Sequence, residues 1–217
     1  MKKHIVCLGD SNTHGSCADP KDSADGQRRF NEEERWPCRL QQSLGSDYLV
    51  LEEGLSGRTM VCPDPLTEGI PALDVIYPIL MSHEPVDLLI IMLGTNDTKD
   101  RFGLSPACIA AGMNRLLMKA KSVPCWGEHL PNILVVCPPH IGEKMVTSSI
   151  GPIMGIHCAE KSAHLAEEME PIVRAQGFAF LDAEGIAEVN QVDYTHLTRK
   201  GHAQLAQKLG EMVPELV

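Results

Sequence analysis

The sequence predicts an α/β protein with helices on both faces of a parallel sheet of about five strands. Short runs rich in Val, Ile and Leu alternate with segments of helical period, and the runs read as strands buried on both faces. These runs are residues 4–8, 48–52, 87–93, 132–137 and 178–181. No internal repeat interrupts the alternation, and 217 residues suit one hydrophobic core. We therefore expect a single domain over residues 1–217 with a three-layer α/β/α architecture.

The helical segments carry recognisable start signals and apolar stripes. Over residues 105–121, Ser105 can cap a helix and Pro106 suits its first turn. Its expected buried stripe is Ile109, Met113, Leu116, Leu117 and Ala120. A helix over residues 161–176 contains Pro171, which should kink or divide it. The last helix should begin after Thr198, with a stripe formed by Leu205, Ala206, Leu209, Met212 and Val213.

This architecture also predicts where a site should lie. Parallel strands joined by right-handed crossovers bring their carboxyl ends to one edge of the sheet, where ligands bind in such folds. The segments after residues 8, 52, 93 and 137 should meet there. Two long, irregular connections, residues 16–34 and 140–157, are either covers of that edge or exposed loops.

Composition excludes several classes of function. The net charge of −10 and the pI near 5.3 would repel a phosphate backbone, so we expect no nucleic-acid partner. The longest apolar runs, such as residues 88–93, are far shorter than the ~20 residues that cross a bilayer. With no membrane span or signal peptide visible, a cytoplasmic protein is expected.

The eight cysteines show no C-x-x-C pair and no pairing with histidine at zinc-ligand spacing. Several lie inside predicted strands, where cysteine usually packs as a small hydrophobe. We expect free thiols, as in a reducing compartment, and no metal or cofactor.

A serine follows the first predicted strand in the turn GDSNTHG, residues 9–15. Between glycines at a strand-to-helix turn, Ser11 can present its hydroxyl above the sheet edge, beside backbone N–H groups and a helix dipole. A phosphate-binding turn is the alternative, but neither G-x-G-x-x-G nor a P-loop lysine is present. Ser11 is therefore a candidate nucleophile.

A base for Ser11 is available near the end of the chain, in the tetrapeptide DYTH at residues 193–196. Asp193 can bond the Nδ1–H of His196 and so direct Nε2 toward a hydroxyl. The alternative is that Asp193 merely braces a turn. A rival base, His202, shares a helix face with apolar residues and is better explained as a packed core histidine. His14 lacks a carboxylate partner and is a candidate pocket-wall residue.

Acyl transfer also needs donors for an oxyanion, and candidates follow the second and third strands. Gly57 could offer a backbone N–H and Asn96 its amide, beside the N–H of Ser11. Taken singly, Gly57 could be a plain turn and Asn96 a cap. Their coincidence at successive strand ends favours an oxyanion hole.

Together these motifs, spanning residues 9–196, resemble the SGNH (GDSL-type) hydrolases. The segments EEGLSGRT at 52–59 and DLLIIMLGTNDTK at 87–99 look most like the bacterial arylesterase and acyltransferase branch. The resemblance implies a flavodoxin-like fold and a triad of Ser11, His196 and Asp193. It also implies an oxyanion hole of Ser11, Gly57 and Asn96, and it implies homo-oligomers. The family's usual D-G-x-H is here D-Y-T-H, so Tyr194 and Thr195 are expected to reshape the pocket.

The expected activity is hydrolysis of short-chain carboxylic esters, aryl or alkyl, through an acyl-enzyme on Ser11, with a small ester as the partner. Asn12, His14 and Thr195 are expected to line the pocket. Polar residues near the nucleophile keep a carbohydrate O-deacetylase open, and the resemblance keeps an acyltransferase open. A non-catalytic binding module and a redox or metal role for the cysteines are the remaining alternatives.

Overall fold

The structure is a computed structural model that describes residues 2–68 and 71–217. Five parallel strands form one sheet in the order β2-β1-β3-β4-β5. They are β1 (Lys3–Gly9), β2 (Tyr48–Gly54), β3 (Leu88–Met92), β4 (Ile133–Cys137) and β5 (Ala179–Asp182). Every residue of β3 and β4 is buried, as strands covered on both faces should be. The predicted α/β fold and its strands are confirmed.

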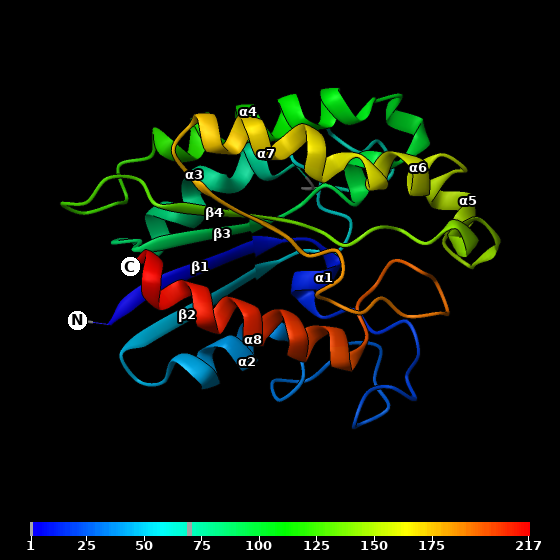
Figure 1. Cartoon of the computed structure of the whole chain (residues 1–217), viewed down its shortest axis with the longest axis horizontal. Coiled ribbons are helices and arrows are strands. Elements are labelled where there is room, and N and C mark those ends of the chain that lie inside the picture. The colour runs from blue at the N-terminus through cyan, green and yellow to red at the C-terminus, as the bar shows by residue number, and fades with distance from the viewer. Residues whose placement is uncertain (1, 69–70) are drawn as a thin grey trace.

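Helices cover both faces of this sheet (Figure 1). On one face lie α3 (Ala72–Ser82), α4 (Pro106–Lys121) and α7 (Leu165–Ala175). On the other lie α2 (Trp36–Leu44) and α8 (Arg199–Leu216). Each side has its own apolar core, and the strands contribute alternate side chains to the two. The three-layer sandwich is therefore the observed arrangement, with the chain termini at the end of the sheet opposite α1 (Ser11–His14).

Two predicted helices begin where their caps indicated. The Ser105 side chain accepts a hydrogen bond from the backbone N–H of Cys108 at the start of α4. Thr198 does the same for Gly201 at the start of α8. The predicted stripe of α4 is buried throughout, whereas in α8 Met212 is only partly buried. Local capping and periodicity were sufficient to predict both helices.

The segment predicted as a helix over residues 161–176 departs from expectation. It divides at His164, between α6 (Cys158–Ala163) and α7, whereas Pro171 lies inside α7. The break occurs where α6 turns away from the sheet to join a small separate cluster containing Cys158. Tertiary packing, rather than the proline, determines where the helix divides.

The connection over residues 140–157 is also more regular than predicted. It contains the 3₁₀ helix η3 (Glu143–Thr147) and the short helix α5 (Gly151–Met154). Residues 16–34 are irregular, as predicted, with isolated turns and a single bridge between Ser16 and Arg29. Two further 3₁₀ turns follow β3, namely η1 (Asn96–Thr98) and η2 (Asp100–Phe102).

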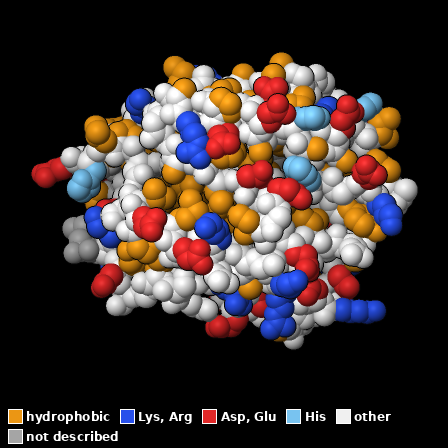
Figure 2. Space-filling model, in the orientation of Figure 1, with side chains coloured by type: hydrophobic (Ala, Val, Ile, Leu, Met, Phe, Trp, Pro, Cys, Tyr) orange, Lys and Arg blue, Asp and Glu red, His pale blue; other side chains and the backbone are white. Residues whose placement is uncertain are grey.

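On the face drawn in Figure 2, Lys and Arg side chains are interspersed with Asp and Glu. All eight cysteines lie in the described ranges and are free thiols, as predicted, and five of them are buried. Burial raises the pKa of the Cys137 thiol, which holds it in the protonated form at neutral pH. Within residues 2–68 and 71–217, no helix combines the length and the apolar character needed to cross a membrane.

Candidate active site

Ser11 begins the one-turn helix α1, immediately after β1. Asp10 caps this turn, because its Oδ1 accepts a hydrogen bond of 2.9 Å from the N–H of Asn12. The turn rests directly on β2: a Cβ atom on Gly54 would overlap the backbone of His14. Glycine at the end of β2 therefore allows α1 to sit at the carboxyl edge of the sheet and to hold Ser11 there.

The structure brings Ser11 together with the histidine that lies 185 residues later in the chain. Ser11 Oγ is 2.9 Å from His196 Nε2, and His196 Nδ1 is 2.6 Å from Asp193 Oδ2. The Asp193 carboxylate accepts the Nδ1–H, so Nε2 is left as the acceptor for the Ser11 hydroxyl. These distances join hydroxyl, imidazole and carboxylate in one hydrogen-bonded chain.

Several N–H groups hold the Asp193 carboxylate in place. Its Oδ1 accepts from the backbone N–H of Thr195 and of His196 and from the side chain of Asn190. Burial alone would raise the pKa of Asp193, but the hydrogen bond to His196 and the charge of that ring lower it well below its usual range. The carboxylate is therefore ionised at neutral pH and can stabilise a positively charged imidazole.

Two asparagines position the loop that carries His196, and neither role was predicted from the sequence. Asn190 Oδ1 accepts from the N–H of Asp193, and its Nδ2 donates to the carbonyl of His196. Asn12 Oδ1 accepts from the N–H of Leu197 at 2.9 Å, which links the Ser11 turn to the loop that carries His196. The asparagine three residues before Asp193 was a usable signal for an Asx turn; the contact made by Asn12 had no local signal.

The candidate oxyanion donors converge near Ser11. Gly57 and Asn96 both line the same cavity as Ser11 and His196. Gly57 has φ of 87°, a left-handed conformation that suits glycine. The Asn96 amide is oriented by one hydrogen bond of 3.3 Å to Asp10 Oδ2. The Gly57 turn is anchored by Arg58, which donates to the carbonyls of Gly9 and Glu53.

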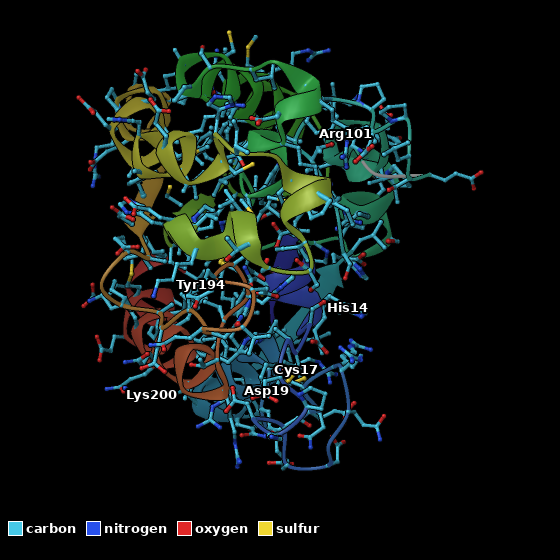
Figure 3. All side chains as sticks on the ribbon, turned by 90° about the vertical axis from the view of Figure 1, so that its right-hand side faces the viewer. His14, Cys17, Asp19, Arg101, Tyr194 and Lys200 are labelled. Carbon is cyan, nitrogen blue, oxygen red and sulfur yellow. The ribbon has the colours of Figure 1, made fainter. Side chains whose placement is uncertain are left out.

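This cavity has a volume of about 470 Å³ and is lined by residues from several loops at the sheet edge. Thr195, a predicted pocket residue, lines it, and Lys99, Arg101 and the α5 segment were not predicted to do so. Asn12 and His14 are absent from its lining. Asn12 is buried and holds the histidine loop instead, and the backbone carbonyl of His14 accepts a hydrogen bond from the Arg29 side chain. Figure 3 views this edge of the molecule, with His14, Arg101 and Tyr194 labelled.

Tyr194 has φ of 59°, an unusual conformation for a residue other than glycine. Its carbonyl accepts from the N–H of Gly142 at 2.8 Å, and its ring packs against Gly142 and the small cluster around Met145. Tyr194 is not among the residues that line the Ser11 cavity. It connects the His196 loop to the 140–157 connection instead.

His202 lies in the core, as the sequence indicated. Its Nδ1 accepts from the backbone N–H of Trp36, and its ring packs edge-on against Phe30 with centroids 4.9 Å apart. Complete burial lowers the pKa of His202 to about 3, so the ring stays neutral at physiological pH. It is therefore a packing residue rather than a second base.

Asp97 is a buried acid directly beside the candidate oxyanion hole. Its Oδ1 accepts from the N–H of Met60 at 2.9 Å, whereas its Oδ2 has no hydrogen-bond partner among the described residues. Burial raises the pKa of Asp97 to about 7, with a smaller contribution from the neighbouring Asp10. The neutral acid is therefore favoured in the folded state below that pH.

This shift makes stability depend on pH in a defined direction. The folded pKa of Asp97 exceeds its ordinary value of 3.8, so its contribution to stability is complete below 3.8 and is lost as the pH rises to about 7. We expect Asp97→Asn to remove this loss. The difference in unfolding free energy, wild type minus variant, should fall across this pH range in urea titrations. Groups that do not interact with Asp97 cancel in the difference, and a difference independent of pH would contradict the assignment.

The sequence and the fold of this chain are similar to those of known proteins. Residues 7–204 match the GDSL-like lipase/acylhydrolase family. The chain belongs to this family. The predicted membership of the SGNH (GDSL-type) hydrolases is thus confirmed. No curated protein sequence gives a significant match to this GDSL-family chain.

Solved structures of esterases superimpose over 99–100% of this chain. An aryl esterase from M. smegmatis is 33% identical with a TM-score of 0.87, covering 99% of this chain and 100% of that one. A carbohydrate acetylesterase from Sinorhizobium meliloti is 29% identical with a TM-score of 0.87, covering 100% of both chains. Another carbohydrate acetylesterase family member from that organism is 30% identical, with a TM-score of 0.87 and coverage of 99% and 98%.

Proposed function

We propose that this protein is a carboxylic ester hydrolase that uses Ser11 as its nucleophile. The observation that carries the proposal is the chain of hydrogen bonds from Ser11 through His196 to Asp193, with lengths of 2.9 and 2.6 Å. The cavity that opens onto Ser11 supports it, since an ester can reach the hydroxyl from there. The esterases among the superimposed structures support it further.

In the proposed reaction, Ser11 Oγ attacks the ester carbonyl carbon while His196 Nε2 takes the hydroxyl proton. Asp193 stabilises the imidazolium that forms. The N–H groups of Ser11 and Gly57 and the Asn96 amide would receive the developing oxyanion. His196 then gives the proton to the departing alcohol, which leaves an acyl group on Ser11. Water, deprotonated by His196, hydrolyses this acyl-enzyme and restores the free hydroxyl.

Short acyl groups are the proposed substrates because the cavity is small and its wall is partly apolar. Ile150, Ile153, Met154 and Leu66 line it together with the polar groups near Ser11. A volume of about 470 Å³ lies in the lower part of the range for small-molecule sites. An ester panel that varies the acyl and alcohol parts separately tests this. The expected result is a decline in kcat/KM with increasing chain length, and no hydrolysis of any ester would refute the proposal.

A second candidate function is O-deacetylation of carbohydrates. Three residues with hydroxyl groups line the cavity: Ser16 and Ser56, whose side-chain oxygens are 3.1 Å apart, and Thr67. Such groups can bond to sugar hydroxyls, and two of the superimposed structures are carbohydrate acetylesterases or family members. Acetylated xylose and phenyl acetate should be compared under matched conditions. A negligible rate on every acetylated sugar would eliminate this candidate.

Labelling with a fluorophosphonate probe separates both hydrolases from a non-catalytic binding module. The probe phosphonylates a serine only when an adjacent base activates it. We expect labelling of Ser11, located by mass spectrometry of the peptide that spans GDSNTHG at residues 9–15. An unlabelled protein with an intact fold would favour a binding module.

A further inference from the structure

The apolar wall of the Ser11 cavity is built on a short segment with little support from the main cores. Ile150, Ile153 and Met154 line the cavity from α5 and the residue before it, and α5 has only four residues. Neither large core cluster includes them; Met154 belongs to a small third cluster with Ile141, Met145 and Cys158. Ile153 is 54% exposed, so apolar burial alone holds it weakly.

Polar contacts from η2 hold this segment instead. Asp100 Oδ2 accepts from the backbone N–H groups of Ile156 and His157, and its Oδ1 accepts from the Lys161 side chain. Gly155 lies so close to Asp100 that an added Cβ would overlap the carboxylate. Asp100 therefore ties the end of α5 to the turn that follows the candidate oxyanion residue Asn96.

The next residue, Arg101, joins two walls of the cavity. Its Nη1 donates to the carbonyl of Ile153 at 2.7 Å, and its Nη2 donates to Asp64 Oδ2 at 2.9 Å. These partners lie 52 residues after and 37 residues before Arg101 in the chain. Arg101 itself lines the cavity, as do Ile153 on one side and Leu66, two residues after Asp64, on the other.

The Asp64 end of this bridge is firmly fixed. The Asp64 side chain is fully buried, and its Oδ2 also accepts from Lys99 Nζ at 3.1 Å. Burial would raise the pKa of Asp64, but hydrogen bonds from Arg101, Leu66 and Lys99 lower it to about 2. The carboxylate thus stays ionised, and its charge strengthens the bond to the guanidinium. Arg101 uses one N–H of each terminal nitrogen on a protein acceptor and so connects the two walls of the cavity.

We propose that Arg101 determines the size limit of the substrate by bracing Ile153 against Asp64, so that the α5 wall cannot move away from Ser11. The proposal rests on the proposed esterase function. While the hydrogen bonds of Arg101 to Ile153 and Asp64 are intact, the α5 wall excludes esters with long acyl chains from the cavity. Without the brace, the weakly supported α5 segment moves outward and the cavity admits them. Arg101 makes its hydrogen bonds to Ile153 and Asp64 and not to Ser11, His196 or Asp193, so its loss acts through the shape of the cavity.

The test compares wild type with Arg101→Met, which keeps a side chain of similar length and removes both hydrogen bonds. Substrates are para-nitrophenyl acetate, butyrate and octanoate. The expected result is a rise of about tenfold in the octanoate-to-acetate ratio of kcat/KM, the size of discrimination that a pocket wall provides. The expected effect is on this ratio, because a residue that lines the cavity can also alter the rate with acetate itself. Arg115→Ala, which removes a cation from an exposed position on α4, is the matched control and should leave the ratio unchanged.

A second measurement does not depend on activity. Amide hydrogen exchange over residues 148–157 should be faster in Arg101→Met than in wild type or Arg115→Ala, because local opening exposes these amides. An unchanged ester ratio together with unchanged exchange would overturn the proposed role of Arg101. Failure of the wild-type protein to hydrolyse any of the three esters would instead count against the esterase function, while the exchange result would still test the brace.

Discussion

Replacing Ser11 with alanine is expected to lower kcat for ester hydrolysis by about 10⁶-fold, the size of loss seen when the serine nucleophile of a catalytic triad is removed. The physical reason is that, among the residues that the structure describes, His196 Nε2 hydrogen-bonds to the Ser11 hydroxyl alone, with Oγ at 2.9 Å. Without that oxygen no acyl-enzyme can form. The measurement is the steady-state rate with para-nitrophenyl acetate.

The fold should survive this substitution. Within the described part of the chain, the Ser11 side chain hydrogen-bonds only to His196, and alanine suits the first position of α1. The melting temperature should therefore stay close to that of the wild type, and Ser46→Ala, at an exposed position in the loop before β2, is the matched control. Full activity in folded Ser11→Ala would overturn the assignment of the nucleophile.

The fold was predictable because its signals are local. Each signal depends on residues close together in the chain, as do the buried strands, the Ser105 and Thr198 caps and the apolar stripe of α4. The right-handed crossover rule then predicts how the layers are arranged. The order β2-β1-β3-β4-β5 places β1 beside β3. Ser11 and Asn96 follow these two strands, so their proximity could be anticipated from strand order and motif position.

What the sequence did not predict depends on contacts between distant segments. The bond from Leu197 to Asn12 and the bond from Arg58 to Gly9 span 185 and 49 residues, and neither has a periodic or capping signature. The α5 wall was likewise missed, because short helices outside the main cores are held by specific polar contacts such as those of Arg101. The prediction of pocket-lining residues relied on sequence neighbours of Ser11. It therefore included Asn12 and His14, which do not line the cavity, and omitted Lys99 and α5, which do.

Asp193→Asn is expected to lower kcat by about 10⁴-fold with little loss of stability, because it should invert the tautomer of His196. Oδ1 of residue 193 accepts three hydrogen bonds, from Asn190, Thr195 and His196, and only an oxygen can accept them. An asparagine must therefore keep its oxygen there and turn its amide nitrogen toward Nδ1, which lies 2.6 Å from Oδ2 in the wild type.

An amide N–H directed at Nδ1 forces that nitrogen to act as an acceptor, so the ring proton moves to Nε2. Nε2 then donates toward Ser11 and cannot accept its proton, although every atom stays near its original place. Asp74→Asn removes an exposed carboxylate from α3 and should leave the rate unchanged. If folded Asp193→Asn kept the wild-type kcat, the carboxylate would only brace the loop. Because protein stability is measured separately, the loss of rate can be attributed to the direction of one proton rather than to a collapsed site.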